Sequence, residues 1–82
     1  MRGLTKKERR ALELEIKKTD YDKDKLRIIV GAKQHEGFYT VSFTIMDGEN
    51  SQILFVPFKS APDIKRIVKQ LGNLAPVVTE AM

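Results

Sequence analysis

The stretch that most constrains the fold is residues 37–58, GFYTVSFTIMDGENSQILFVPF, in which two strand-like segments flank a turn. Residues 38–46 alternate, and β-branched and aromatic residues fill nearly every position, as is typical of a strand. One of its faces carries Tyr39, Val41, Phe43 and Ile45. The Asp47-Gly48 pair is typical of a hairpin turn. Residues 52–58 form the second strand, which Pro57 places at a sheet edge because proline cannot donate to a ladder.

The N-terminal residues are ambiguous between helix and strand. Thr5 and Glu8 match the capping-box pattern, which predicts a short helix over residues 6–11. Residues 11–18 then alternate between apolar and charged side chains, with a period that suits a strand. The alternative is one helix that continues to Lys18, which the strong helix formers favour. We prefer the strand.

Two further elements complete the chain. The alternation of residues 25–33 predicts a strand with Leu26, Ile28, Val30 and Ala32 on one face. Gly31 within it indicates a bulge. Residues 60–72 predict a helix capped by Ser60. Its apolar stripe consists of Ile64, Ile67, Val68 and Leu71.

The predicted fold is α+β: a short N-terminal helix, a four-stranded antiparallel meander, and a C-terminal helix packed on one sheet face. With 82 residues, the chain is expected to form a single domain, residues 1–82. Residues 1–5 and 74–82 are expected to be flexible or docking tails. Since no cysteine is present and no apolar core follows the basic N-terminus, we expect a cytoplasmic protein without a membrane span.

The strand at residues 52–58 is apolar on both faces, whereas one helix covers only one of them. We predict that Leu54, Val56 and Phe58 form the uncovered set, which would forgo about 1.5–3 kcal/mol per large side chain if left in water. The C-terminal tail, the N-terminal helix or a second copy of the chain could cover it. We favour a homodimer, because an exposed apolar edge strand promotes aggregation.

No pattern of residues indicates catalysis, and we predict no enzyme, cofactor or metal site. Residues 20–31 begin like a calcium loop, but Lys25 stands where glycine is needed and Gly31 where glutamate is needed. His35 is the only histidine and lacks partners at zinc-site spacing.

The basic residues instead favour binding. The formal charge is +4, from 15 Lys and Arg against 11 Asp and Glu. We predict a single-stranded nucleic-acid site in which cations track phosphates, hydroxyls bond to them and a ring stacks a base. Glu13 and Glu15 count against this site if residues 11–18 are a strand on the same sheet. The predicted site consists of Lys6, Lys7, Arg9, Arg10, Arg27, Lys33, Phe38, Thr40 and Ser42.

A sheet of four antiparallel strands followed by a helix resembles the coactivator-type and Whirly-type single-stranded-DNA-binding domains. That resemblance implies a dimer that binds strands across a sheet face. The alternative function is a small protein-interaction factor or inhibitor, of the kind that phages encode, which would bind its partner by strand addition at residues 52–58.

Overall fold

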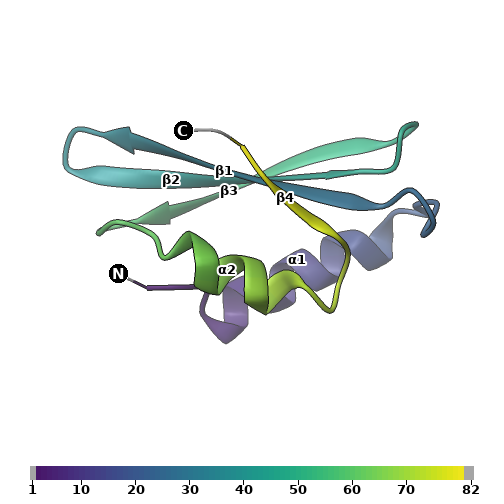
Figure 1. Ribbon diagram of the computed structural model, residues 1–82, viewed down its shortest axis with the longest axis horizontal. Coiled ribbons are helices and arrows are strands. Elements are labelled where there is room, and N and C mark those ends of the chain that lie inside the picture. The colour runs from purple at the N-terminus through teal and green to yellow at the C-terminus, as the bar shows by residue number, and fades with distance from the viewer. Residues whose placement is uncertain (1, 81–82) are drawn as a thin grey trace.

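The computed structural model describes residues 2–80, in which two helices lie against one face of a four-stranded sheet (Figure 1). The elements are α1 (Lys6–Lys18), β1 (Arg27–His35), β2 (Phe38–Met46), β3 (Ser51–Phe58), α2 (Ile64–Leu71) and β4 (Val77–Thr79). The sheet order is β3-β2-β1-β4. Neighbours β1, β2 and β3 are antiparallel, whereas β4 runs parallel to β1. The α+β class is confirmed, and a mixed sheet replaces the predicted antiparallel meander.

Residues 11–18 continue helix α1, so the predicted strand there was wrong. The capping box is present: the Thr5 hydroxyl accepts from the Glu8 amide at 3.2 Å, and the Thr5 amide donates to the Glu8 carboxylate at 2.9 Å. Leu12 is 1% exposed, and Ile16, one helical turn further on, packs against the same core. Leu14 is 52% exposed on another side of the helix. The alternating residues therefore include an i, i+4 pair, Leu12 and Ile16, which a helix can also bury. Helix propensity and the capping box favour the helix over the strand.

The β2–β3 hairpin has a four-residue loop, residues 47–50, closed by a hydrogen bond from the Asp47 amide to the Asn50 carbonyl at 3.1 Å. Gly48 takes a φ of 96°, a conformation that glycine adopts without steric cost. This loop length pairs Phe43 with Leu54. Even-numbered residues of β3 therefore lie on the same sheet face as the odd-numbered residues of β2.

Leu54, Val56 and Phe58 accordingly lie on the face that the helices cover, which contradicts their prediction as the uncovered set. Phe58 is 1% exposed, and Leu54 and Val56 are half-buried against the core. The continued helix α1 supplies the cover. Its Glu15 carboxylate accepts a hydrogen bond from Gln52 of β3 at 2.7 Å.

The core lies between the sheet and the two helices. Buried side chains from β1, β2 and β3 meet those of the helices, and the largest are Phe43, Phe58, Leu12, Ile28, Ile45, Ile67 and Leu71. The predicted helix at residues 60–72 is confirmed as α2, with Ile67 and Leu71 of its stripe buried. Its N-cap is Asp63, whose carboxylate accepts from the Arg66 amide at 3.2 Å, and not Ser60.

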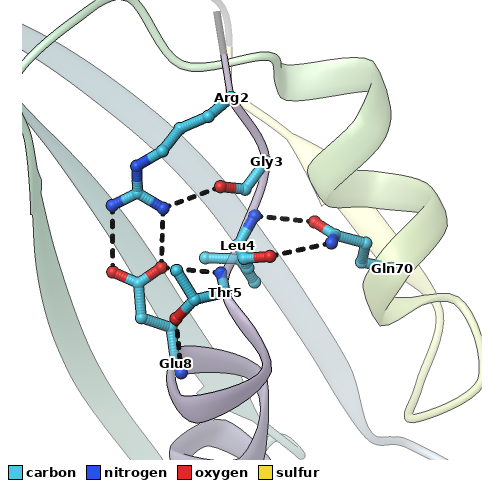
Figure 2. A network of polar contacts seen from close by, with 6 residues as sticks. All are labelled: Arg2, Gly3, Leu4, Thr5, Glu8 and Gln70. Carbon is cyan, nitrogen blue, oxygen red and sulfur yellow. Dashed lines mark hydrogen bonds and ion pairs between the residues drawn. The ribbon is translucent and has the colours of Figure 1, made fainter.

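The described parts of both chain ends dock on the domain. Residues 77–79 form β4 beside β1. Near the N-terminus, Leu4 is buried and the Arg2 guanidinium makes two hydrogen bonds to the Glu8 carboxylate, at 2.7 and 3.1 Å (Figure 2). The same guanidinium lies 3.9 Å from the ring centroid of Phe58, a cation–π contact. The remainder of the predicted tails, residues 1 and 81–82, lies outside the described residues.

Candidate binding surface on the open face of the sheet

One face of the sheet packs against the helices, and we call the opposite one the open face (Figure 1). Strand pairing arranges its side chains in rows that cross the sheet. One row runs from Val78 through Ile29 and Thr44 to Ile53. A neighbouring row runs from Gly31 through Ser42 to Phe55. The strand residues of this face are Arg27, Ile29, Gly31, Lys33, His35, Phe38, Thr40, Ser42, Thr44, Met46, Ser51, Ile53, Phe55, Pro57 and Val78.

Large apolar side chains stand exposed on the open face. Phe55 is 65% exposed, Ile53 is 53% exposed and Val78 is 49% exposed. Phe38 is also exposed, at the end of the sheet where β1 and β2 are joined. An apolar cluster of this kind, framed by polar side chains, is typical of a binding surface.

The open face is also positively charged. Arg27 and Lys33 are exposed on β1, with His35 two residues beyond Lys33. None of the strand residues that form this face is an aspartate or glutamate, although the carboxylate of Glu80, the residue after β4, reaches the face over Gly31. Glu13 and Glu15 lie on helix α1, in the other layer. These two carboxylates therefore do not repel phosphates at this face, as they would if residues 11–18 were a strand of the sheet.

An aromatic pair closes one end of the open face. The rings of His35 and Phe38 are stacked, with centroids 4.5 Å apart and an interplanar angle of 15°. The two residues are direct cross-strand partners, which brings their side chains together. Phe38 is the ring that the sequence predicted to stack a base. One face of this ring is already stacked on His35.

The part of the open face toward the β1–β2 turn has a hollow of about 440 Å³. Its lining includes Lys33, His35, Thr40, Ser42, Phe55 and Glu80. Gly31 lies beside it and is in continuous register with β2, so the predicted bulge is absent. A Cβ at Gly31 would stand 2.5 Å from the Glu80 carboxylate and 3.0 Å from the Ser42 hydroxyl. The missing side chain at Gly31 thus makes room for the Glu80 carboxylate.

The predicted site residues fall into two groups. Arg27, Lys33, Phe38, Thr40 and Ser42 come together on the open face. Lys6, Lys7, Arg9 and Arg10 lie on α1, in the helix layer. There the Arg9 side chain donates to the Gln70 carbonyl at 2.8 Å and pairs with Glu13 at 3.6 Å. The N-terminal cations therefore do not share a surface with the sheet residues.

Sequence reasoning missed Phe55 and Ile53 as exposed residues of this face, and missed Glu80 and His35 in the hollow. For β3, the length of the 47–50 loop could have predicted which residues are exposed. A four-residue loop at 47–50 pairs residue 46 with 51, and the alternation then leaves the odd-numbered residues of β3 on the open face. For Glu80 no local signal exists, because its position follows from the pairing of β4 with β1.

A second hollow, of about 620 Å³, lies between the end of α1 and the connection from α2 to β4. Its walls are mostly apolar and include Ile16, Leu26 and Leu74, with Tyr21 beside them. The Tyr21 hydroxyl is buried and has no hydrogen-bond partner within residues 2–80. Across the same residues, no three side chains of His, Asp or Glu gather where they could hold a metal ion.

No helix in the described part of the chain has the length and apolar character that a membrane span requires. Comparison of the chain with protein-family models, with curated proteins and with solved structures found no match. The expected likeness to coactivator-type and Whirly-type domains rested on a meander of four antiparallel strands, which the mixed sheet does not contain.

Proposed function

We propose that this protein is a non-enzymatic binding module for single-stranded nucleic acid and that the open face is its platform. The observation that carries the proposal is Phe55, a phenylalanine that is 65% exposed on the edge strand β3, on a sheet face that also bears cations. Exposing so large a ring is unfavourable in water, and stacking against an unpaired base removes much of that exposure.

The chemistry of the open face suits each part of a nucleotide. Arg27 and Lys33 offer charge to phosphates, and the Glu80 carboxylate, which reaches this face from just beyond β4, is the one acidic group among the residues that line the hollow. The hydroxyls of Thr40, Ser42 and Thr44 are on β2, between the cations of β1 and the exposed apolar side chains of β3, where they can donate to phosphate or sugar oxygens. A ring exposed on a sheet face can stack only on bases that are free of a duplex, which favours single strands.

The test is fluorescence anisotropy with a labelled single-stranded oligonucleotide at low salt. Phe55→Ala is expected to weaken binding by about 5- to 150-fold, the loss of one stacked base. Leu14→Ala is the matched control, because Leu14 is similarly exposed but lies on α1. If the wild-type protein leaves the anisotropy unchanged, or if both variants lose binding equally, the proposal is wrong. A duplex of the same sequence should bind more weakly than the single strand.

A second candidate function, association with protein, is favoured by the exposed apolar side chains Ile53, Phe55 and Val78. β3 is an edge strand: within residues 2–80 no strand pairs with its outer side, so another chain could add there. The partner could be a second copy, in the homodimer expected from the sequence, or a different protein. Light scattering at micromolar concentration decides the first case, since a mass near 9.4 kDa contradicts the dimer. Ile53→Lys should convert a dimer into a monomer.

A further inference from the structure

The position of Glu80 is set by the pairing of the C-terminal strand. Its amide donates to the Val30 carbonyl at 2.9 Å, which places the residue immediately after β4 beside Gly31. The side chain then crosses the bare backbone of Gly31. One carboxylate oxygen lies 2.5 Å, and the Ser42 hydroxyl 3.0 Å, from the point where a Cβ of Gly31 would stand. A carboxylate and a hydroxyl therefore converge on one spot of the open face.

The Glu80 carboxylate is available to a ligand. The residue is exposed, and no hydrogen bond or ion pair joins its side chain to another residue of the described range 2–80. A carboxylate at this point repels phosphate groups. In single-stranded DNA it strengthens binding by accepting hydrogen bonds from a base, since bases present N–H donors on their edges, and in RNA the ribose 2′-hydroxyl is a further donor.

The same row of the sheet carries the ring proposed to stack a base. Phe55 is the cross-strand partner of Ser42, and Ser42 is the partner of Gly31. Because neighbouring strands are about 4.8 Å apart, Phe55 and Gly31 are separated by roughly 10 Å. A base stacked on Phe55 with its hydrogen-bonding edge toward β1 therefore presents that edge to Ser42 and Glu80.

Bases differ in what they offer to a carboxylate. Guanine presents two adjacent N–H donors, which match the two carboxylate oxygens in a bidentate pair. Cytosine and adenine present an amino group on this edge. Thymine and uracil present one N–H flanked by two carbonyl oxygens, which a carboxylate repels.

We propose that Glu80, assisted by Ser42, makes the open face selective for guanine at the position stacked on Phe55. This inference rests on the proposed function, because it assigns a base preference to the same platform. Glu80 is a specificity-determining residue in this scheme, whereas Arg27 and Lys33 contribute affinity without regard to sequence.

The experiment compares three labelled oligothymidines whose central base is thymine, guanine or hypoxanthine. Hypoxanthine is guanine without its amino group, so it isolates the second hydrogen bond. Anisotropy titrations of the wild-type protein should show guanine bound about tenfold more tightly than thymine, with hypoxanthine between them. In Glu80→Gln, the difference between guanine and hypoxanthine should fall below about twofold, since the amide offers one acceptor in place of two.

Glu49→Gln is the matched control. It removes the same charge from an exposed position in the β2–β3 loop, and it should keep the full guanine preference. Gly31→Ala is a second test, because the added Cβ displaces the Glu80 carboxylate without changing its charge. It should also lose the preference. Circular dichroism and urea unfolding verify that each variant is folded before its titration is interpreted.

Two results overturn this inference and leave the proposed function standing. One is a wild-type protein that binds all three oligonucleotides with equal affinity. The other is a Glu80→Gln variant that binds all three more tightly while the ranking of the wild type persists, which would make the carboxylate a source of repulsion only. If none of the three binds to the wild-type protein, the proposed function fails, and the guanine preference fails with it.

Discussion

The side-chain amide of Gln70 pairs with both main-chain polar groups of Leu4. The Leu4 amide donates to Gln70 Oε1 at 2.7 Å, and Gln70 Nε2 donates to the Leu4 carbonyl at 2.9 Å (Figure 2). A side chain of α2 thus supplies to the N-terminal segment the pair of hydrogen bonds that a neighbouring strand would supply. This contact places Leu4 in the core and sets the entry into α1.

Gln70→Ala should lower the free energy of unfolding by about 1–3 kcal/mol, because both main-chain groups of Leu4 lose their partner in a partly buried place. Alanine is the better helix former, so helix propensity works against this loss and cannot explain it. Urea unfolding measures the effect. Gln34→Ala, at an exposed position near the end of β1, is the control and should change stability much less.

Phe58→Ala and Phe55→Ala test which face of β3 the helices cover. Phe58 is buried, so its removal should cost about 3–5 kcal/mol of unfolding free energy. Phe55 lies three residues away in the same strand and is mostly exposed, so its removal should change stability by roughly 0.5 kcal/mol or less. Equal destabilisation of the two variants would contradict the strand register described above.

Because of the hydrogen bonds to Asp47, we expect the free energy of unfolding to depend on pH. Its buried carboxylate accepts hydrogen bonds from the backbone amides of Asn50 and Asp22, both at 2.7 Å, and from the Glu49 amide at 3.0 Å. These donors, the Asn50 amide first, lower the pKa of Asp47 from 3.8 to about 2. A depressed pKa means that the stabilisation is complete above about pH 4 and disappears as the pH falls toward 2.

Asp47→Asn should therefore lower the urea midpoint at neutral pH and reduce the decline of stability between pH 4 and pH 2. Asp24→Asn is the control, because Asp24 is an exposed residue of the nearby α1–β1 connection whose carboxylate has no described partner. It should leave the pH profile of the wild type unchanged. A wild-type profile that is flat across this range would show that the hydrogen bonds to Asp47 do not stabilise the folded state.

Salt dependence tests where the nucleic acid lies. The double substitution Arg27→Ala and Lys33→Ala should reduce the slope of log affinity against log salt by about 1 for each phosphate that the protein no longer neutralises. The double substitution Lys6→Ala and Lys7→Ala removes the same charge from α1, in the other layer, and should change the slope much less. If the second pair has the larger effect, the helix face and not the sheet is the binding surface.

Features that depend on neighbouring residues could be predicted. The alternation of residues 38–46 predicts β2, and the apolar stripe of residues 60–72 predicts α2. The capping box at Thr5 is present as expected. The strand at residues 11–18 was wrong because Leu12, Leu14 and Ile16 satisfy a period of two as well as an i, i+4 pair. Short apolar runs carry this ambiguity, and packing of α1 on the sheet resolves it.

Five of the nine predicted nucleic-acid-binding residues share the open face, because alternation along β1 and β2 assigns their side chains to one side. The exposure of Phe55 depends in addition on the length of the 47–50 loop, since a shift of one residue would exchange the two faces of β3. The place of Glu80 depends on a short strand, β4, that pairs with β1 although β2, β3 and α2 lie between them in the chain.

Local chemistry alone was therefore enough to specify the hairpin, the capping box and the side of each strand that carries cations and hydroxyls. Caps, turns and alternation act between residues a few positions apart, so the order of amino acids reveals them directly. Only tertiary packing decided that Leu54, Val56 and Phe58 face the helices, that Phe55 is exposed and that Glu80 lies over Gly31. Those outcomes result from long-range strand pairing and from competition between surfaces for burial, which depend on the whole chain at once.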